Sequence, residues 1–357
     1  MPERTRSALS ACLLVAACQT AERTPEADAV VADSSAAASP AVEYVYVSNE
    51  GAGTVTILDP AGDTVVAAIQ VGTRPRGIRV SADGRTVYVA LTGSPRCPPT
   101  MPDEECDRMV ADKSKDGIGV VDVATRRLVR VLPGGSDPET FDVSRDGSRV
   151  FVSNEDVDSA TIVDVASGRI LHTVPVGREP EGVRLHPDGR EVWVTGETDH
   201  DITVLDTDSG RTIARIPVGR RPRDLAFTPD GNVAYVTAEV GGTITVVDAR
   251  THRVLRTIAL PDGARPMGVV LSPDGSRVYV ANGRGGTVSA IDARTDSIIG
   301  SVAVGVRPWG IGITADGRKL YTANGPSGDV TVVDAGTLRV IGRIPTGELP
   351  WGIAAGR

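Results

Sequence analysis

Aromatic side chains are scarce in this sequence. Its 357 residues include only three Trp, six Tyr and three Phe, so a folded core has to be built mainly from Val, Ile, Leu and Ala. Cysteine is also rare. The four cysteines, at positions 12, 18, 97 and 106, lack the CxxC…CxxC spacing of a structural zinc site and the CxxCH sequence that attaches haem. With only four scattered histidines, we expect neither a metal nor a cofactor.

Long apolar runs and an excess of basic residues are absent too. No stretch approaches the roughly 20 apolar residues that a membrane-spanning helix needs. The chain has 38 Lys and Arg against 46 Asp and Glu, a net charge of −8. Because a negative surface does not displace counterions from nucleic acid, nucleic acid is not an expected partner.

The N-terminus has the layout of an export signal. Arg4 and Arg6 precede an apolar run of about ten residues. The run ends in Leu-Val-Ala-Ala-Cys at Cys18. This ending resembles a bacterial lipobox, which implies that Cys18 is acylated and becomes the mature N-terminus. We expect residues 1–17 to be a lipoprotein signal peptide, with an ordinary secretory signal as the alternative. The protein would then lie in the periplasm or at the cell surface, on the outer membrane of a Gram-negative cell.

Residues 18–42 differ in composition from the rest of the chain. They are rich in Ala, Ser, Thr, Pro, Glu and Asp, with no periodicity and no aromatic residue. A segment of this kind cannot bury enough apolar surface to fold. It predicts a disordered tether between a lipid anchor and a folded domain at 43–357.

Residues 43–357 consist of one unit repeated seven times. A proline recurs at Pro75, Pro138, Pro180, Pro222, Pro266, Pro308 and Pro350. An aromatic residue recurs at Tyr46, Tyr88, Phe151, Trp193, Tyr235, Tyr279 and Tyr321. An aspartate recurs at Asp59, Asp122, Asp164, Asp206, Asp248, Asp292 and Asp334. All three markers share a spacing of 42 to 44 residues, apart from one interval of 63.

Each unit contains four short apolar runs, for example 182–185, 191–194, 202–205 and 212–216. Runs of this length, rich in β-branched residues and separated by turn residues, are typical of strands. Asp-Gly pairs join the first two runs in six units and favour tight antiparallel hairpins. Four-stranded units of about 42 residues predict an all-β fold, a seven-bladed β-propeller with four-stranded antiparallel blades.

The two ends of the repeat predict how the ring closes. The first unit begins at its second strand, 44–48, and has no Asp-Gly pair. The last segment, 350–355, is a first strand alone. We expect this C-terminal strand to join the N-terminal blade, so that no sheet edge stays open at the junction.

The second strands carry a motif of a known family. The segments 87–90, 234–237, 278–282 and 320–324 each follow an Asp-Gly turn and precede a strand that ends in Asp. They resemble the repeats of YVTN β-propellers, including the YncE-like periplasmic proteins. The resemblance covers about residues 43–357. It implies the fold and leaves the activity open, because the functions of that family are diverse.

Candidate binding residues lie near the repeated prolines. In a propeller the first strand of each blade lines the central channel, and the residues around its proline face one end of that channel. The candidate ligand-binding residues are Arg76, Arg79, Asp142, Arg184, Arg223, Trp309 and Trp351. Charges of both signs beside two Trp residues suit a zwitterionic or anionic organic ligand. The alternative is that the charges pair between blades and the Trp side chains cover the channel rim.

The second unit is 21 residues longer than the others, and the excess falls in a loop within 94–116 on the same face. An exported chain folds under oxidising conditions, so we expect Cys97 and Cys106 to form a disulfide. Closing that loop would contribute roughly 2.5–3 kcal/mol in the chain-entropy model. The loop is either a recognition element or a surface elaboration.

Catalytic patterns are few. The sequence has no GxSxG, SxxK or HExxH motif. If the protein is an enzyme, its candidate catalytic residues are Glu139, Glu181, His200 and Arg223. The acidic residues that would join His200 around a divalent cation are Glu155, Asp156 and Asp158. Acidic loops are more often simply solvated, so no metal site is predicted.

These patterns predict an exported, lipid-anchored, monomeric propeller that binds a small molecule or an exported partner protein through its channel face, without catalysis. One alternative is a lactonase-like enzyme or another hydrolase or lyase. The resemblance implies it, since related propellers include lactone hydrolases and cofactor-bearing domains of nitrogen-oxide reductases. The other alternative is that the protein is an accessory scaffold for a periplasmic quinoprotein or cytochrome pathway.

Overall fold

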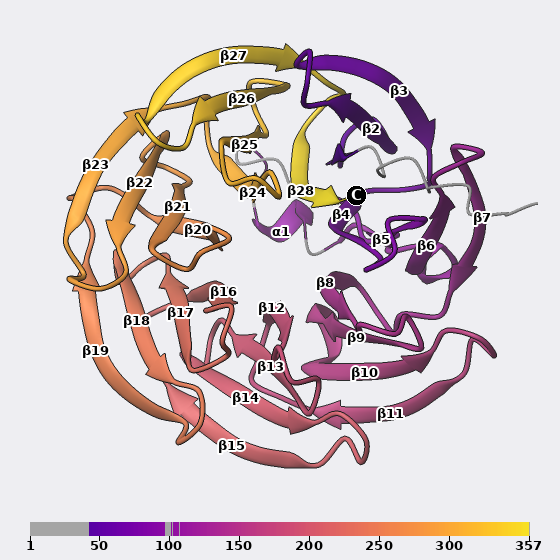
Figure 1. The fold of residues 1–357 in the computed structure, drawn as a ribbon. Coiled ribbons are helices and arrows are strands. Elements are labelled where there is room, and N and C mark those ends of the chain that lie inside the picture. Colours follow the sequence, from indigo (N-terminus) through magenta and orange to yellow (C-terminus); the bar gives the residue numbers. More distant parts are fainter. Residues whose placement is uncertain (1–42, 97–100, 102, 107, 357) are drawn as a thin grey trace, which may run out of the picture. The chain divides into compact units, whose positions relative to one another are not determined.

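The computed structural model describes residues 43–96, 101, 103–106 and 108–356. Within these ranges the chain forms 28 β-strands, one short α-helix and two 3-10 helices. The strands form seven four-stranded sheets, which are arranged as blades around a central axis (Figure 1). The predicted seven-bladed propeller is confirmed. The predicted signal peptide, tether and lipidated Cys18 lie outside the described residues.

Each blade is an antiparallel sheet, numbered here from its inner strand outward. Blade 1 consists of β28 (Pro350–Gly356), β1 (Tyr44–Asn49), β2 (Thr54–Asp59) and β3 (Thr64–Gln70). Blade 2 consists of β4 (Pro75–Val80), β5 (Thr86–Leu91), β6 (Gly117–Asp122) and β7 (Arg127–Leu132). Blade 3 consists of β8 (Pro138–Val143), β9 (Arg149–Asn154), β10 (Ser159–Asp164) and β11 (Ile170–Pro175). Blade 4 consists of β12 (Pro180–Leu185), β13 (Glu191–Gly196), β14 (Asp201–Asp206) and β15 (Thr212–Pro217).

The remaining three blades repeat the same order. Blade 5 consists of β16 (Pro222–Phe227), β17 (Val233–Ala238), β18 (Thr243–Asp248) and β19 (Arg253–Ala259). Blade 6 consists of β20 (Pro266–Leu271), β21 (Arg277–Asn282), β22 (Thr287–Asp292) and β23 (Ile298–Ala303). Blade 7 consists of β24 (Pro308–Ile313), β25 (Lys319–Asn324), β26 (Asp329–Asp334) and β27 (Arg339–Pro345). Every blade therefore begins its inner strand at the repeated proline.

The ring closes through blade 1, as the repeat ends predicted. The C-terminal β28 pairs antiparallel with β1, with Val47 opposite Ile353 and Val45 opposite Ala355. The backbone N–H of Gly352 also donates to Ser48 Oγ at 2.9 Å. The last strand of the chain thus fills the inner edge that the first strand would leave unpaired.

The hydrophobic core lies between neighbouring blades. Tyr46 of blade 1 packs with Val87 and Val89 of blade 2 in one buried cluster, and the other repeated aromatic residues are likewise at most 5% exposed. The outermost strands, by contrast, are mostly exposed, as in β19. A single blade cannot bury its own faces, so each is stabilised by the blades beside it.

The repeated aspartate ends the third strand and caps the turn that follows. Asp59 Oδ1 accepts a hydrogen bond from the Ala61 N–H at 2.8 Å, and Asp122 Oδ1 accepts one from the Thr125 N–H at 2.7 Å. The aspartates are therefore structural. They take up turn N–H groups that would otherwise lack a partner.

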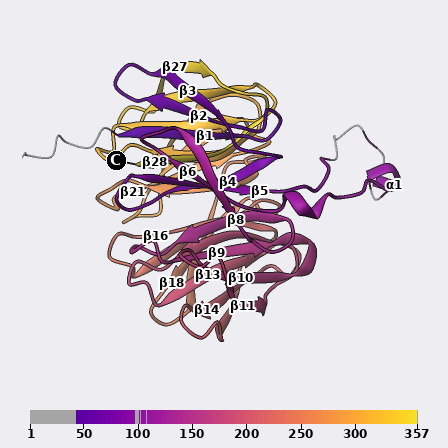
Figure 2. The ribbon, with the colours of Figure 1, turned by 90° about the vertical axis from the view of Figure 1, so that its right-hand side faces the viewer.

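The long loop of blade 2 lies between β5 and β6. It contains α1 (Asp103–Cys106) and the 3-10 helix η1 (Lys113–Lys115), and α1 stands off the blades in the side view (Figure 2). The 3-10 helix η2 (Glu155–Val157) follows β9 in blade 3. Lys113 pairs with Asp156 of that helix, which ties the base of the loop to blade 3. Among the described residues no helix has the length and apolar character required to cross a membrane.

Candidate functional site at the channel

A repeated backbone conformation sets the start of every inner strand. The residue before each of the seven prolines has a left-handed φ, between 42° and 60°, although none of these residues is glycine. In blade 3 this turns the Asp137 carbonyl to accept a hydrogen bond from the Glu155 N–H at 3.1 Å, and in blade 5 the Arg221 carbonyl accepts one from Glu239 at 2.8 Å. The entry loop is thus held against the loop between the second and third strands.

The residue after each proline then lies at the mouth of the channel. These seven residues are Trp351, Arg76, Glu139, Glu181, Arg223, Met267 and Trp309, from blade 1 to blade 7. Blades 2 to 5 contribute charged side chains and blades 6, 7 and 1 contribute apolar ones. The mouth is therefore divided into a charged half and an apolar half.

One ion-pair network in the charged half centres on Arg76. This guanidinium pairs with Glu139, with Glu50 at 3.3 Å and with Glu155 at 3.5 Å. Arg74, beside the same proline, also binds Glu50 at 2.7 Å. Burial opposes the ionisation of Glu50, but the two guanidinium groups outweigh it and hold the pKa of Glu50 below its ordinary value.

A second network centres on Arg223. It binds Glu181 at 2.8 Å, pairs with Glu197, and lies 3.9 Å from Glu239. Arg221 pairs with Glu197 too. Burial raises the pKa of Glu181 to about 8 despite the nearby Arg223, and the neighbouring Glu155 and Glu197 raise it further. The protonated form of Glu181 therefore predominates at neutral pH.

Three of these carboxylates were missed in the sequence. Glu50, Glu197 and Glu239 each follow a second strand directly, four residues after the repeated aromatic. Glu155 occupies the same register in blade 3, while Gly283 stands there in blade 6. A comparison of the residues at this position in all seven units would have revealed these glutamates. They lie in the loops between the second and third strands and face the arginines beside the repeated prolines.

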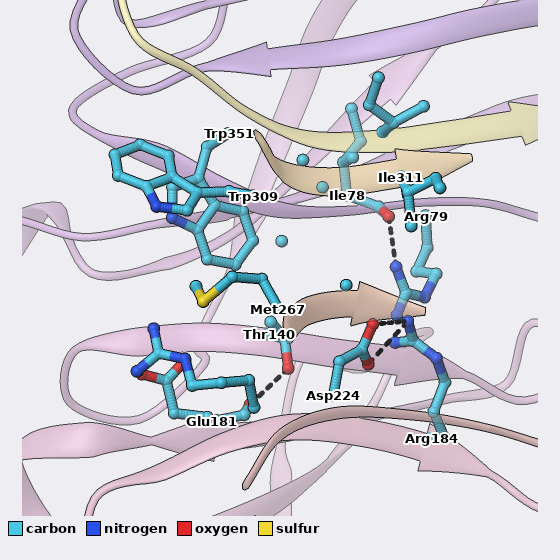
Figure 3. Close-up of a pocket in the computed structure, with 16 residues that line it drawn as sticks. Ile78, Arg79, Thr140, Glu181, Arg184, Asp224, Met267, Trp309, Ile311 and Trp351 are labelled. Atoms are coloured by element: carbon cyan, nitrogen blue, oxygen red, sulfur yellow. Dashed lines mark hydrogen bonds and ion pairs between the residues drawn. The ribbon is translucent and has the colours of Figure 1, made fainter. Parts of the chain in front are cut away.

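The apolar half is made by Met267, Trp309 and Trp351 (Figure 3). A Cβ at Gly325 would lie 2.7 Å from the Trp309 ring, so the glycine leaves space for the indole. The Arg307 guanidinium lies 5.5 Å from the centre of the Trp309 ring, within cation–π range. These contacts hold one apolar wall beside the cavity.

Four charged residues alternate in sign deeper in the channel. Arg79 Nε lies 3.5 Å from Asp142, and Arg184 Nη2 lies 2.9 Å from Asp224. Burial raises the pKa of Asp224 to about 7, although Arg79 lowers it, and burial also raises the pKa of Asp142. Arg79, Asp142 and Arg184 are among the binding residues predicted from the sequence, but Asp224 is not.

These residues surround a cavity of about 70 Å³ in the channel. Since one water molecule needs roughly 10–15 Å³ of such space, the cavity holds several waters or part of a small organic molecule. Five of the predicted binding residues line it, namely Arg79, Arg184, Arg223, Trp309 and Trp351. Arg76 lies 6.0 Å from the Trp351 ring centre, and Asp142 contacts Arg79. The charges also pair between blades, as the alternative interpretation expected, so ligand binding by these residues remains a prediction.

Only two of the four candidate catalytic residues line the cavity. Glu181 and Arg223 line the cavity, whereas Glu139 pairs with Arg76 at the mouth. His200 is not among the residues that line the cavity. Its Nδ1 lies 2.9 Å from the Glu197 carbonyl and 3.2 Å from the Arg221 nitrogen, which fixes it in its loop.

The acidic residues proposed around His200 do not form a cation site with it. Asp156 pairs with Lys113, and Asp158 accepts a hydrogen bond from the Glu179 N–H at 3.0 Å. Within the described ranges, the one group with metal-ligand geometry is Asp137, Glu139 and Glu155, whose oxygens lie within 4.8 Å of one another. Arg76 pairs with two of these carboxylates and supplies the positive charge that a cation would bring.

The predicted disulfide is not tested by the structure. Cys97 lies outside the described residues, and so does the side chain of Cys106. The bond therefore stays a prediction.

Two family models match parts of the chain. Residues 101–190 match the YNCE-like β-propeller model, and residues 183–337 match the lactonase model, a seven-bladed β-propeller. The first match confirms the resemblance that the repeats indicated. No curated protein sequence matches the chain.

Solved structures show the same fold at low sequence identity. A chain of Kuenenia stuttgartiensis hydrazine synthase is 20% identical, with a TM-score of 0.68 over 82% of this chain and 92% of that one. A candidate 6-phosphogluconolactonase from Bacteroides fragilis is 17% identical, with a TM-score of 0.72 over 88% and 98%. A functionally unknown protein from Desulfotomaculum acetoxidans is 17% identical, with a TM-score of 0.73 over 87% and 98%. The chain is therefore a seven-bladed β-propeller similar to the YNCE-like and lactonase propellers.

Proposed function

We propose that the protein binds a small organic molecule in the channel cavity and does not convert it. The observation that supports this most is the division of the mouth. Met267, Trp309 and Trp351 offer apolar surface on one side, while the arginines and carboxylates on the other side are held in ion pairs. A mostly apolar pocket with a few fixed polar groups is the usual form of a small-molecule site.

The side chains around the cavity favour binding over catalysis. Among the described residues that line it, the only hydroxyl belongs to Thr140, and no His, Cys, Ser or Lys is present. That hydroxyl donates to the Glu181 carbonyl oxygen at 2.5 Å. Since Arg223 is bound by several glutamates, it is engaged in positioning them. The described lining of the cavity therefore offers no hydroxyl, thiol or amine nucleophile with an adjacent base.

The setting of this activity is also part of the proposal. The basic start, the apolar run and Cys18 support export and a lipid anchor, and the oxidising compartment supports a Cys97–Cys106 disulfide. We place the protein in the periplasm or at the cell surface, as a monomer tethered to a membrane through 18–42. The loop at 94–116 would then be exposed to other exported proteins.

A second candidate is lactone hydrolysis. It is favoured by the match of 183–337 to the lactonase model, together with Glu181, a buried acid in the cavity wall whose raised pKa suits general acid–base work. Turnover of a lactone panel with a bell-shaped pH–rate profile, lost in Glu181→Gln, would establish this candidate and displace simple binding.

The binding function is tested with the chain's own fluorescence. A Trp193→Phe background removes the Trp that is fully buried between blades 4 and 5. The remaining tryptophan fluorescence then comes from Trp309 and Trp351 and reports on ligand binding beside them. Compounds that raise the melting temperature are titrated against this variant. We expect Trp309→Ala to weaken their affinity by about tenfold, since an aromatic wall contributes beyond its buried area.

The matched control is Val306→Ala, because Val306 is exposed near the same strand and its loss should leave the affinity unchanged. Equal affinity in Trp309→Ala, Trp351→Ala and the control would refute a ligand site at the channel mouth.

A further inference from the structure

The deep end of the cavity has a different character from its mouth. Arg79 on β4 and Arg184 on β12 both line it, and both guanidinium groups point toward Asp224 (Figure 3). The two arginine side chains retain 21% and 20% of their exposure. They are thus accessible from the cavity.

Neither guanidinium is saturated by its neighbours. Among the described residues, Arg79 donates to the Ile78 carbonyl at 2.8 Å and lies 3.5 Å from Asp142. Arg184 donates to the Val183 carbonyl at 3.0 Å and pairs with Asp224. Because each guanidinium has five N–H groups in a planar fork, several donors remain for a ligand.

The carboxylates beside these arginines are weak counterions. The carboxylate of Asp142 already accepts hydrogen bonds from the Val143 and Leu185 N–H groups at 2.9 and 2.8 Å. Asp224 accepts one from Leu225 at 2.9 Å. These hydrogen bonds favour the ionised carboxylates, but burial outweighs them and raises the pKa of both aspartates, that of Asp224 to about 7. Since guanidinium does not deprotonate in proteins, the deep end carries surplus positive charge when an aspartate takes up a proton.

An apolar wall stands next to this charge. Trp309, Met267 and Ile311 line the same cavity as the two arginines. A molecule with one anionic group and a flat apolar body would therefore satisfy both regions at once, whereas an inorganic anion would leave the wall in contact with water.

Building on the proposed binding function, we propose that the ligand is a small organic carboxylate whose acid group binds Arg79 and Arg184 and whose apolar body packs against Trp309. Arg–carboxylate hydrogen bonds are short and can be bidentate. The ligand's carboxylate takes the place of Asp224 as the partner of Arg184, and Asp224 takes up a proton.

The groups around Asp224 determine the expected pH dependence. Arg184 faces it from β12, Arg79 from β4 and Asp142 from β8, while β20 contributes the Val269 N–H at 3.4 Å. An anion bound beside Asp224 raises the pKa of that residue further, so binding takes up protons. Affinity for a carboxylate should therefore rise as the pH falls from 9 to 6.

The test compares three phenyl probes of similar size, namely benzoate, benzamide and benzylammonium, each titrated against the Trp193→Phe protein. We expect benzoate to bind about ten- to a hundredfold more tightly than benzamide, the range for hydrogen bonds to charged groups. The preference should fall in Arg184→Gln, partly return in Arg184→Lys, and drop to near unity when Arg79→Gln is combined with Arg184→Gln. It should persist in Arg145→Gln, which alters an exposed arginine on a hairpin turn.

Further readouts separate this proposal from the function on which it rests. In Asp224→Asn the pH dependence of the benzoate affinity should shrink to the part that Glu181 contributes from the same cavity wall. A purely structural role of Asp224 would leave the pH dependence unchanged. Equal binding of benzoate and benzamide, or tightest binding of benzylammonium, would overturn the carboxylate class and leave the binding function in place. Binding of none of the three, together with no Trp309-dependent ligand in the compound screen, would overturn both.

Discussion

The close approach of the inner strands can be tested at Gly310. This glycine lies on β24 and lines the cavity, next to Trp309. A Cβ built on it would lie 2.5 Å from the Trp351 carbonyl oxygen, 3.0 Å from the Gly352 Cα and 3.0 Å from the Ile353 nitrogen. All three are backbone atoms of β28, so none can rotate away. Gly310→Ala must push blades 7 and 1 apart.

The cost follows from overpacking. Inserting a methyl group into a well-packed interface typically costs about 1–3 kcal/mol. With an unfolding entropy of about 2.1 cal/mol/K per residue over 43–356, that is a fall in melting temperature of roughly 2–5 °C. The same displacement separates Trp309 from Trp351, so affinity for any ligand of the apolar wall should fall as well.

The assay is thermal and urea unfolding of two matched variants. Gly342→Ala is the control, because Gly342 lies on the outer strand β27 and its added Cβ would meet only the Val332 side chain at 3.7 Å. Alanine there should be neutral or stabilising by less than about 1 kcal/mol. Equal stability of the two variants would refute the idea that inner-strand glycines set the blade spacing.

Two further predictions concern closure and pH. Deletion of 350–357 removes β28 and its pairing with β1, and should abolish the cooperative melting transition; a transition like that of the full chain would disprove closure through blade 1. Burial raises the pKa of Glu181 from 4.5 to about 8, so the folded state binds more protons than the unfolded state between these values, and stability falls as the pH rises through 8. Glu181→Gln should reduce the difference in unfolding free energy between pH 6 and 9, and an undiminished difference in urea titrations would contradict this.

The fold could be predicted because its cause is local and repeated. Each blade carries its own turn signals, such as the capping Asp59 and the proline that opens the inner strand. The buried aromatic, such as Tyr46, recurs at the same place in every unit. Seven copies of one pattern average out the ambiguity of a single short strand. The first unit lacks an inner strand and the last segment, 350–356, is a single strand, which together predict that this segment completes the first blade.

The candidate site was predictable only in part. Arg79, Arg184, Trp309 and Trp351 were found because they break the repeat at a register known to face the channel. Asp224 was missed because it lies two residues after the repeated proline, a position that is glycine in five blades. The residues at that position were not compared between the units. His200 was a catalytic candidate because its loop faces the channel, but its Nδ1 lies against the Glu197 carbonyl and it is not among the residues that line the cavity.

The sequence by itself determined the number of blades, their strand order and the closure of the ring, because each depends on short-range patterns that recur along the chain. Only the tertiary structure decided which charges meet. The pairing of Arg223 with Glu197, and the raised pKa of Asp224, depend on distances and burial between different blades. These residues, 26 positions apart for Arg223 and Glu197 and 40 for Arg184 and Asp224, become neighbours only when adjacent blades pack together. No periodicity in the sequence records how deeply each is then buried.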